Sequence, residues 1–147
     1  MAKLLQLPQI WLALFCAAGF ALGLALPVNL PPILRVAGFL LFGAGAALMI
    51  WAAGTMMRAR TSVMPGRIPA AIVTTGPFAF SRNPIYLGDL AIFASLMLAL
   101  ETVAGLVLLP VFALTLKHLF IRSEEQRLAA RFGADYARYC GAVRRWL

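Results

Sequence analysis

The sequence contains few of the residues that bind metals or form disulfides. Its 147 residues include one histidine, His118, and two cysteines, Cys16 and Cys140, which are far apart in the chain. Cys16 falls in an apolar segment and Cys140 near the C-terminus, so neither a disulfide nor a metal site is predicted. A zinc site needs several ligands, and a nucleophile triad needs a partner close to its histidine, so His118 alone supports neither.

Charged residues are also scarce, and acidic ones most of all. They make up 12% of the chain, about half the share in a typical soluble domain, and five acids stand against thirteen lysines and arginines. By contrast, 63% of the residues are hydrophobic and the mean hydropathy is +0.89. The chain also lacks a P-loop, a GxGxxG motif after a strand, internal repeats and low-complexity tracts. This is the composition of a membrane protein.

Four apolar segments predict four transmembrane helices in an all-α integral membrane protein. They cover residues 10–26, 36–57, 85–100 and 103–121. At about 1.5 Å per residue, the first two are long enough for a hydrocarbon core of about 30 Å. The third is short and needs its flanking turns, and Lys117 and His118 interrupt the fourth. We expect a single membrane domain over residues 1–147.

Cationic residues predict the orientation in the membrane. All of them except Arg35 lie before the first segment, in the loop 58–82, or at and after the end of the fourth segment. The positive-inside rule therefore places both termini and this loop in the cytoplasm. The net charge of +8 is then explained by topology and by attraction to anionic lipid. Nucleic acid is a poor alternative partner, because no soluble module presents these cations.

The loop 58–82 and the tail 122–147 are the longest segments outside the predicted spans. The loop combines prolines and glycines with apolar residues, which indicates a folded functional segment. In the tail, Leu128 and Tyr136 belong to an apolar row at helical spacing, and Gly133 is expected to end one helix before another begins. We expect the tail to form cytoplasmic interfacial helices that fold back toward the loop.

The segment SRNPIYLGD is unusually polar for this chain. Ser81 or Asn83 is suited to cap a helix, and Pro84 suits its first turn, so a helix is expected to begin there. The free N–H groups at such a helix start can bind the polar end of a ligand. An equally simple interpretation is a helix start at the membrane interface, with Arg82 and Tyr86 as anchors.

Two further features predict internal packing rather than chemistry. Asp89 lies one turn into the predicted third helix, where an unpaired carboxylate costs about 2.5–3.5 kcal/mol at the membrane centre. We therefore expect Asp89 to pair with Arg82 or Arg58. Gly19, Gly23 and the glycines of GFLLFGAGAAL predict close contacts between helices.

The segment KHLFIRSEEQR ends the fourth apolar segment and contains adjacent acids, Glu124 and Glu125. On an α-helix, His118, Arg122 and Glu125 share one face. Acids here can accept hydrogen bonds from ribose hydroxyls or an ammonium group, or can form ordinary ion pairs on a solvated face. His118 is expected to lie at the interface, paired with a neighbour.

Together, these two segments resemble the signature of the membrane methyltransferase superfamily that includes isoprenylcysteine carboxyl methyltransferase and phospholipid N-methyltransferases. The signature is an Arg-His/Asn-Pro-x-Tyr-x-Gly stretch, a hydrophobic hairpin, a Glu-Glu pair and a Phe-Gly-x-x-Tyr-x-x-Tyr tail. In this chain its parts are residues 82–88, Glu124 with Glu125, and residues 132–139. The resemblance extends over about residues 73–147.

The resemblance implies an S-adenosylmethionine-dependent methyltransferase that acts on a lipophilic or lipid acceptor at the cytoplasmic membrane interface. The residues that it implies for cofactor binding are Ala70, Ala71, Ile72, Val73, Phe78, Arg82, Asn83, Pro84, Ile85, Tyr86, Gly88, Glu124 and Glu125. Candidates for catalysis are Glu125 and His118, as a base for an amine acceptor, and Arg122, for a carboxylate acceptor. The family's Gly-x-Gly element corresponds to Gly43 and Gly45.

Three positions depart from the carboxyl methyltransferases. Asn83 replaces their histidine and matches the phospholipid branch. Phe120 stands where they place a substrate-binding arginine, and Arg144 stands where their tail has a proline. These departures disfavour an isoprenylcysteine carboxylate as the acceptor.

Two alternative functions remain open. Membrane sterol reductases share part of this architecture and bind a nicotinamide cofactor, although they usually have more helices. A non-catalytic membrane protein is the other alternative, with a motif that is only a capped helix and a tail that binds anionic lipid.

Overall fold

Every regular element in the described part of the chain is a helix. The computed structural model describes residues 6–62 and 70–147. The longer elements are α1 (Pro8–Ala25), α2 (Pro32–Arg58), α3 (Pro84–Ala99), α4 (Leu109–Leu116) and α5 (Arg122–Ala142). The shorter ones are the 3₁₀ helices η2 (Gly76–Ala79) and η3 (Val103–Leu108) and the π-helical turn η4 (Lys117–Ile121). The predicted all-α class is confirmed.

The predicted segments agree with the helices to within a few residues, except at the end of the fourth. Prolines stand in the first turns of α1, α2 and α3, where a missing N–H costs no helix hydrogen bond. From Val103 onward, η3, α4, η4 and α5 follow one another directly, and within α5 the backbone leaves helical geometry at Gly133. The helix thus continues through η4 into the polar residues beyond Ile121, so the apolar segment and the start of the tail belong to one helical run.

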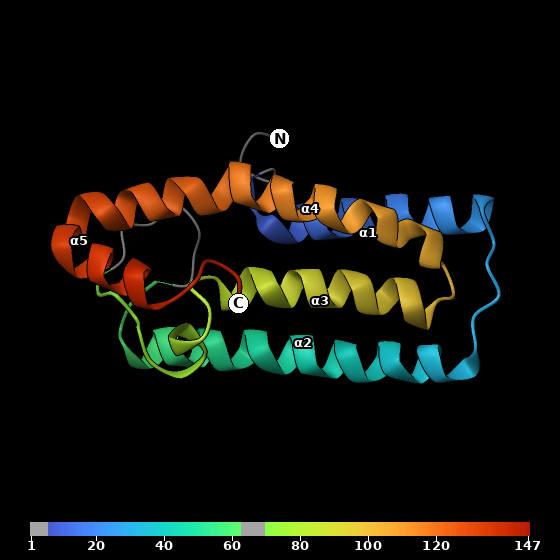
Figure 1. Ribbon diagram of the computed structural model, residues 1–147, viewed down its shortest axis with the longest axis horizontal. Helices are drawn as coiled ribbons and strands as arrows, with labels where there is room; N and C mark the ends of the chain where they lie inside the picture. Colours follow the sequence, from blue (N-terminus) through green and yellow to red (C-terminus); the bar gives the residue numbers. More distant parts are fainter. Residues whose placement is uncertain (1–5, 63–69) are drawn as a thin grey trace.

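Figure 1 shows α1, α2, α3 and α4 side by side along the long axis, with α3 between α2 and the pair formed by α1 and α4. At one end α5 extends beyond this bundle and turns back on itself. The start of α1, the start of α3 and the C-terminus all lie toward that end. The segments expected to carry chemistry are thus gathered at one end of the bundle.

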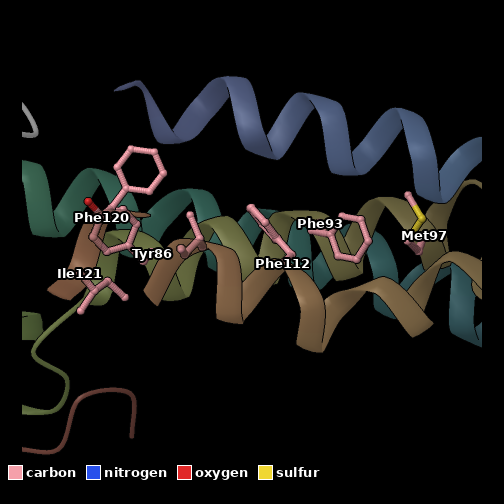
Figure 2. Close-up of a cluster of buried hydrophobic side chains, with 7 residues drawn as sticks. Tyr86, Phe93, Met97, Phe112, Phe120 and Ile121 are labelled. Atoms are coloured by element: carbon pink, nitrogen blue, oxygen red, sulfur yellow. The ribbon is translucent and has the colours of Figure 1, made fainter. Parts of the chain in front are cut away.

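A buried cluster joins α3 to α4 and runs along the bundle (Figure 2). Phe93, Phe112 and Leu116 are fully buried in it, and the ring centroids of Phe93 and Phe112 are 5.7 Å apart. Toward α5 the cluster reaches Tyr86 and Phe120, whose rings stack at a centroid distance of 6.3 Å. The tight core therefore leads directly to the start of α3.

Three helical stretches are long and apolar enough to cross a membrane, namely Pro8–Ala25, Pro32–Arg58 and Val103–Ala142. The fourth apolar helix, α3, is shorter, with 16 residues. Large apolar side chains are exposed on α1 and α2, and those of Leu24, Leu40 and Ile50 are more than half exposed. An apolar outer surface of this kind is compatible with contact with lipid.

Glycines allow the helices to approach closely, as the sequence predicts. A Cβ atom added at Gly23 would stand 2.2 Å from Cβ of Thr102, and one added at Gly19 would stand 2.7 Å from Sδ of Met97. Side chains larger than hydrogen therefore do not fit at these positions. The face formed by Gly19 and Gly23 is covered by other parts of the same molecule.

We expect Gly38→Ala to destabilise the contact between α2 and α3. The added Cβ would stand 2.7 Å from N of Ala99 and 2.9 Å from O of Ser95, and both are backbone atoms of α3. Overpacking of this kind costs about 1–3 kcal/mol, so thermal unfolding in detergent should occur at a lower temperature. Gly43→Ala is the control in the same helix, because its Cβ would meet nothing within 4 Å. Equal unfolding temperatures for the two variants would contradict the packing.

Asp89 is buried without the predicted partner. Its side chain is fully buried, and neither carboxylate oxygen has a hydrogen-bond partner in the part of the chain that the structure describes. Arg82 turns instead toward α5, and its Nη2 lies 3.5 Å from Oε1 of Glu125. Arg58 is exposed at the end of α2. The predicted pairing is wrong, because the turn of α3 that carries Asp89 faces the core.

Candidate functional site

A pocket opens where the start of α3, the helix α5, the loop before α3 and the first turn of α1 meet. It contains about 1090 Å³ of empty space, part of which is open to solvent. Concave sites that combine apolar side chains with a few polar groups are typical binding sites for small molecules.

Most of the residues predicted to bind a cofactor line this pocket, and they come from three parts of the chain. They are Ala71, Ile72, Val73 and Phe78 from the loop, Arg82, Asn83, Pro84, Ile85 and Tyr86 from the start of α3, and Glu124 and Glu125 from α5. The fold thus brings together the two segments that the sequence singles out.

Glu124 is positioned at the pocket by Tyr86. The Tyr86 hydroxyl donates a hydrogen bond to Oε1 of Glu124 at 2.9 Å. Tyr86 itself is held by burial and by stacking on Phe120. Burial raises the pKa of the Glu124 carboxyl above its ordinary value, although the Tyr86 hydrogen bond and the charge of Arg127 oppose this effect. Glu124 is therefore a partly desolvated acceptor fixed in direction by the core.

Glu125 is held by two arginines. Arg145 donates to both carboxylate oxygens, from Nε at 2.9 Å and from Nη2 at 2.8 Å. Arg82 approaches the same carboxylate at 3.5 Å. A bidentate pair fixes the direction of a carboxylate as well as balancing its charge. The hydrogen bonds to Glu125 also raise the pKa of Arg145.

Residues 143–147 form a C-terminal strap behind the start of α3. The Asn83 side-chain amide donates to O of Arg145 at 3.0 Å, and the Ser81 hydroxyl donates to the same oxygen at 3.4 Å. Neither side chain caps α3. The predicted capping role is therefore wrong, because the strap takes up the polar groups that precede the helix.

Tyr139 ties the second half of α5 to the loop. Its hydroxyl donates to O of Phe78 at 2.7 Å, and burial raises the pKa of Tyr139 to about 12. The chain changes direction at Gly133, whose φ of +47° is strained for residues with a side chain. The predicted break at Gly133 and the return of the tail toward the loop are confirmed, and Figure 1 shows this reversal.

Four of the residues predicted for the site do not line the pocket, namely Ala70, Gly88, His118 and Arg122. The amide of Ala70 donates to Oγ1 of Thr61 at 3.1 Å, and Gly88 packs against α2. Nη1 of Arg122 lies 3.2 Å from Nδ1 of His118. This contact confirms that His118 is paired with a neighbour.

Gly43 and Gly45, the suggested counterparts of the family's Gly-x-Gly element, lie away from this pocket. A Cβ added at Gly45 would contact Ala91 of α3, and Gly43 has open space around it. Neither residue lines the pocket. Both lie along the middle of α2, whereas the pocket is built at the end of the bundle.

The π-helical turn η4 lies just before the two acids of α5. Nη1 of Arg122 still reaches Nδ1 of His118, as expected for residues four apart on one face. A π turn contains an extra residue, which changes the direction of the side chains beyond it relative to a regular α-helix. Glu125 lines the pocket and His118 does not. Such turns occur frequently at functional sites.

Sequence reasoning missed several lining residues, namely Pro8, Gln9, Met56, Thr61, Ser62, Arg127, Leu128, Tyr136 and Tyr139. Those of α1 and α2 stand at the ends of apolar helices, where local sequence gives no signal for a site. The two tyrosines did carry a signal, because they belong to the Phe-Gly-x-x-Tyr-x-x-Tyr tail.

Comparison with known proteins shows the family of this chain. A family model for phospholipid methyltransferases matches residues 33–135, which is more than half of the chain. No curated protein and no solved structure matches significantly. The matched range includes the start of α3 and both acids of α5, and so it covers the main walls of the pocket. The chain belongs to the phospholipid methyltransferase family.

Proposed function

We propose that this protein transfers the methyl group of S-adenosylmethionine to a lipophilic acceptor at the cytoplasmic face of a membrane. The acceptor is a phospholipid or a prenylated molecule similar to the substrates of the carboxyl methyltransferases. The observation that carries the proposal is the pocket that joins Glu124 to the start of α3, in a chain of a methyltransferase family.

The residues of the pocket fit the chemistry of this cofactor. Glu124 offers a carboxylate to ribose hydroxyls or an ammonium group. Apolar and aromatic side chains such as Ile72, Ile85 and Phe78 offer a surface for a purine ring.

When bound, S-adenosylmethionine supplies an electrophilic methyl group. The protein's own contribution is then to orient the two reactants and to exclude water. Tyr86 holds Glu124 toward the pocket, and Arg145 holds Glu125. Because both oxygens of Glu125 already accept hydrogen bonds, we assign this residue a positioning role rather than the role of a base.

We also propose four membrane spans, formed by α1, α2, α3 and the apolar part of the run from η3 to η4. An even number of spans puts both termini on one side, and the position of Pro8 and the C-terminal strap at the same end of the bundle supports this. The distribution of lysine and arginine favours the cytoplasm for that side. The pocket would then receive its cofactor from the cytoplasm and its acceptor from the bilayer.

Ligand titration and product analysis test this function together. Purified protein in detergent is titrated with S-adenosylmethionine and, separately, with NADPH, and we expect binding of the former alone. Incubation with methyl-labelled S-adenosylmethionine and total membrane lipid should then label a lipid that mass spectrometry identifies. Binding of NADPH in place of S-adenosylmethionine would favour a reductase, and binding of neither would favour a non-catalytic lipid-binding protein.

The affinity for the cofactor is expected to fall as the pH is lowered. The fall should begin at a higher pH than it would if Glu124 were an exposed glutamate. Burial raises the pKa of Glu124, and the ionised carboxylate is the form that accepts hydrogen bonds from a ligand. Affinity is therefore full above this raised pKa and is lost as the pH falls through it. Calorimetric titration over a pH series measures the effect, and Glu124→Gln should remove it. A wild-type affinity that does not change with pH would rule out this dependence.

A further inference from the structure

A second groove lies beside the pocket and shares part of its wall. Arg82, Glu125 and Tyr136 line both, and Arg122 and Gln126 of α5 line only the groove. The groove therefore adjoins the proposed cofactor site without being part of it. Two cationic residues line the groove, Arg82 and Arg122, and of these Arg122 does not line the pocket.

Positive charge exceeds negative charge around this groove. Arg82 and Arg145 both contact Glu125, at 3.5 Å and 2.8 Å, and Arg122 lines the same groove. The other acids of the chain are engaged elsewhere: Glu101 with Arg35, Asp135 with Arg138, Glu124 with Tyr86, and Asp89 inside the core. Two guanidinium groups thus contact the one carboxylate, Arg122 lines the groove without an acid partner in the described part of the chain, and a ligand with negative charge would balance the excess.

An unsatisfied donor in the same wall also favours an anionic ligand. Nε of Arg82 is buried and has no hydrogen-bond partner among residues 6–62 and 70–147. Buried donors without partners are rare in folded proteins and commonly mark the position of a missing acceptor. The unsatisfied donor and the excess charge meet in the wall that contains Arg82, and both favour an oxyanion.

The groove also adjoins the end of the apolar part of the run from η3 to η4. Arg122 is the first residue of α5, directly after the apolar stretch that ends with Ile121. Cations at such a boundary contact lipid phosphates. The ring of His118, with Nδ1 at 3.2 Å from Nη1 of Arg122, holds this guanidinium in place.

We propose that this groove binds the phosphodiester of the lipid acceptor and that Arg122 is its main contact. The inference rests on the proposed function and narrows it, because it favours a glycerophospholipid over a prenylated carboxylate. The pocket and the groove share a wall formed by Arg82, Glu125 and Tyr136. With the phosphate in the groove, the rest of the headgroup reaches the pocket at this wall. The carboxylate of S-adenosylmethionine is also an oxyanion and could occupy the same groove. The test therefore distinguishes binding of the lipid phosphate from binding of the cofactor carboxylate.

The test compares Arg122→Gln with Arg131→Gln, a control at an exposed arginine of the same helix. Protein in detergent is titrated with dihexanoyl phosphatidylethanolamine and with dihexanoylglycerol, which lacks the phosphate, and retention is measured by native mass spectrometry. We expect Arg122→Gln to weaken retention of the phospholipid by about 10-fold, as for loss of one charged hydrogen bond. Retention of dihexanoylglycerol, affinity for S-adenosylmethionine and the behaviour of Arg131→Gln should all be unchanged.

Equal retention of the phospholipid by wild type and Arg122→Gln would overturn the inference. A loss of affinity for S-adenosylmethionine with retention of the phospholipid would also overturn it and would assign the groove to the cofactor carboxylate. The lipid measurement needs no turnover. If Arg122 is required for phospholipid retention but no methyl group is transferred, the groove stands and the proposed function fails.

Discussion

Glu124→Gln is expected to weaken the binding of S-adenosylmethionine by about 10- to 150-fold. Loss of a hydrogen bond to a charged group costs about 1.5–3 kcal/mol, and each 1.4 kcal/mol corresponds to a factor of ten. Glutamine keeps the shape of the side chain but removes the charge and replaces one acceptor by a donor. The other acid of the pocket, Glu125, is already held by Arg145 and is not expected to take its place. Isothermal titration calorimetry in detergent measures the change.

Two further variants make the Glu124 result specific. Asp135→Asn removes an exposed acid of the same helix that pairs with Arg138 at 3.4 Å, and we expect unchanged affinity. Tyr86→Phe keeps the charge of Glu124 but removes the hydroxyl that orients it, so a smaller loss is expected. Circular dichroism checks that each variant is folded. Wild-type affinity in Glu124→Gln would remove this residue from the binding site.

Arg145→Ala is expected to weaken cofactor binding by roughly 10-fold and to lower the unfolding temperature. The substitution removes both hydrogen bonds to Glu125 and leaves a partly buried carboxylate with Arg82 as its nearest cation. Breaking a partly buried charged pair in this way costs more than the pair contributes when both partners are present. Arg145 does not line the pocket, so its effect on affinity is transmitted through Glu125 and the start of α3.

The neighbouring arginine supplies a matched control for Arg145. The side chain of Arg144 is exposed, and its contact with the start of α3 is made by its backbone oxygen, which accepts from N of Arg82 at 3.0 Å. Arg144→Ala should therefore behave as wild type. Arg145→Lys keeps the charge but not the two-point geometry, and we expect an intermediate affinity. If alanine at residue 145 left both affinity and unfolding temperature unchanged, the strap would have no positioning role.

The two adjacent acids of α5 have different environments. Glu124 is partly desolvated, accepts one hydrogen bond from Tyr86 and has its pKa raised by burial. Glu125 is clamped by Arg145 and approached by Arg82. We infer that Glu124 meets the ligand directly, whereas Glu125 joins the strap to the start of α3. For this reason we predict a larger loss of cofactor affinity for Glu124→Gln than for Arg145→Ala.

The sequence alone determined the all-α class, the approximate positions of the helices and the two segments that meet at the pocket, although not all of the residues that line it. Apolar segments of sufficient length and prolines at helix starts are local signals, so the starts of α1 to α3 were predictable to within a few residues. The break at Gly133 was equally local, because only glycine adopts its backbone conformation without strain. The ordered motifs around Asn83 and Glu124 indicated the family before any geometry was known.

The tertiary structure alone decided which polar groups meet. Asp89 and Arg82 are close in sequence, yet Asp89 faces the core while Arg82 pairs with Glu125 of α5. Arg145 reaches Glu125 because the chain reverses at Gly133 and returns to the start of α3, and no local pattern specifies such a long-range contact. The π turn likewise shifts the register after His118, which spacing rules for an α-helix do not anticipate. Helical periodicity fixes faces within one element, whereas partners between elements depend on how those elements pack.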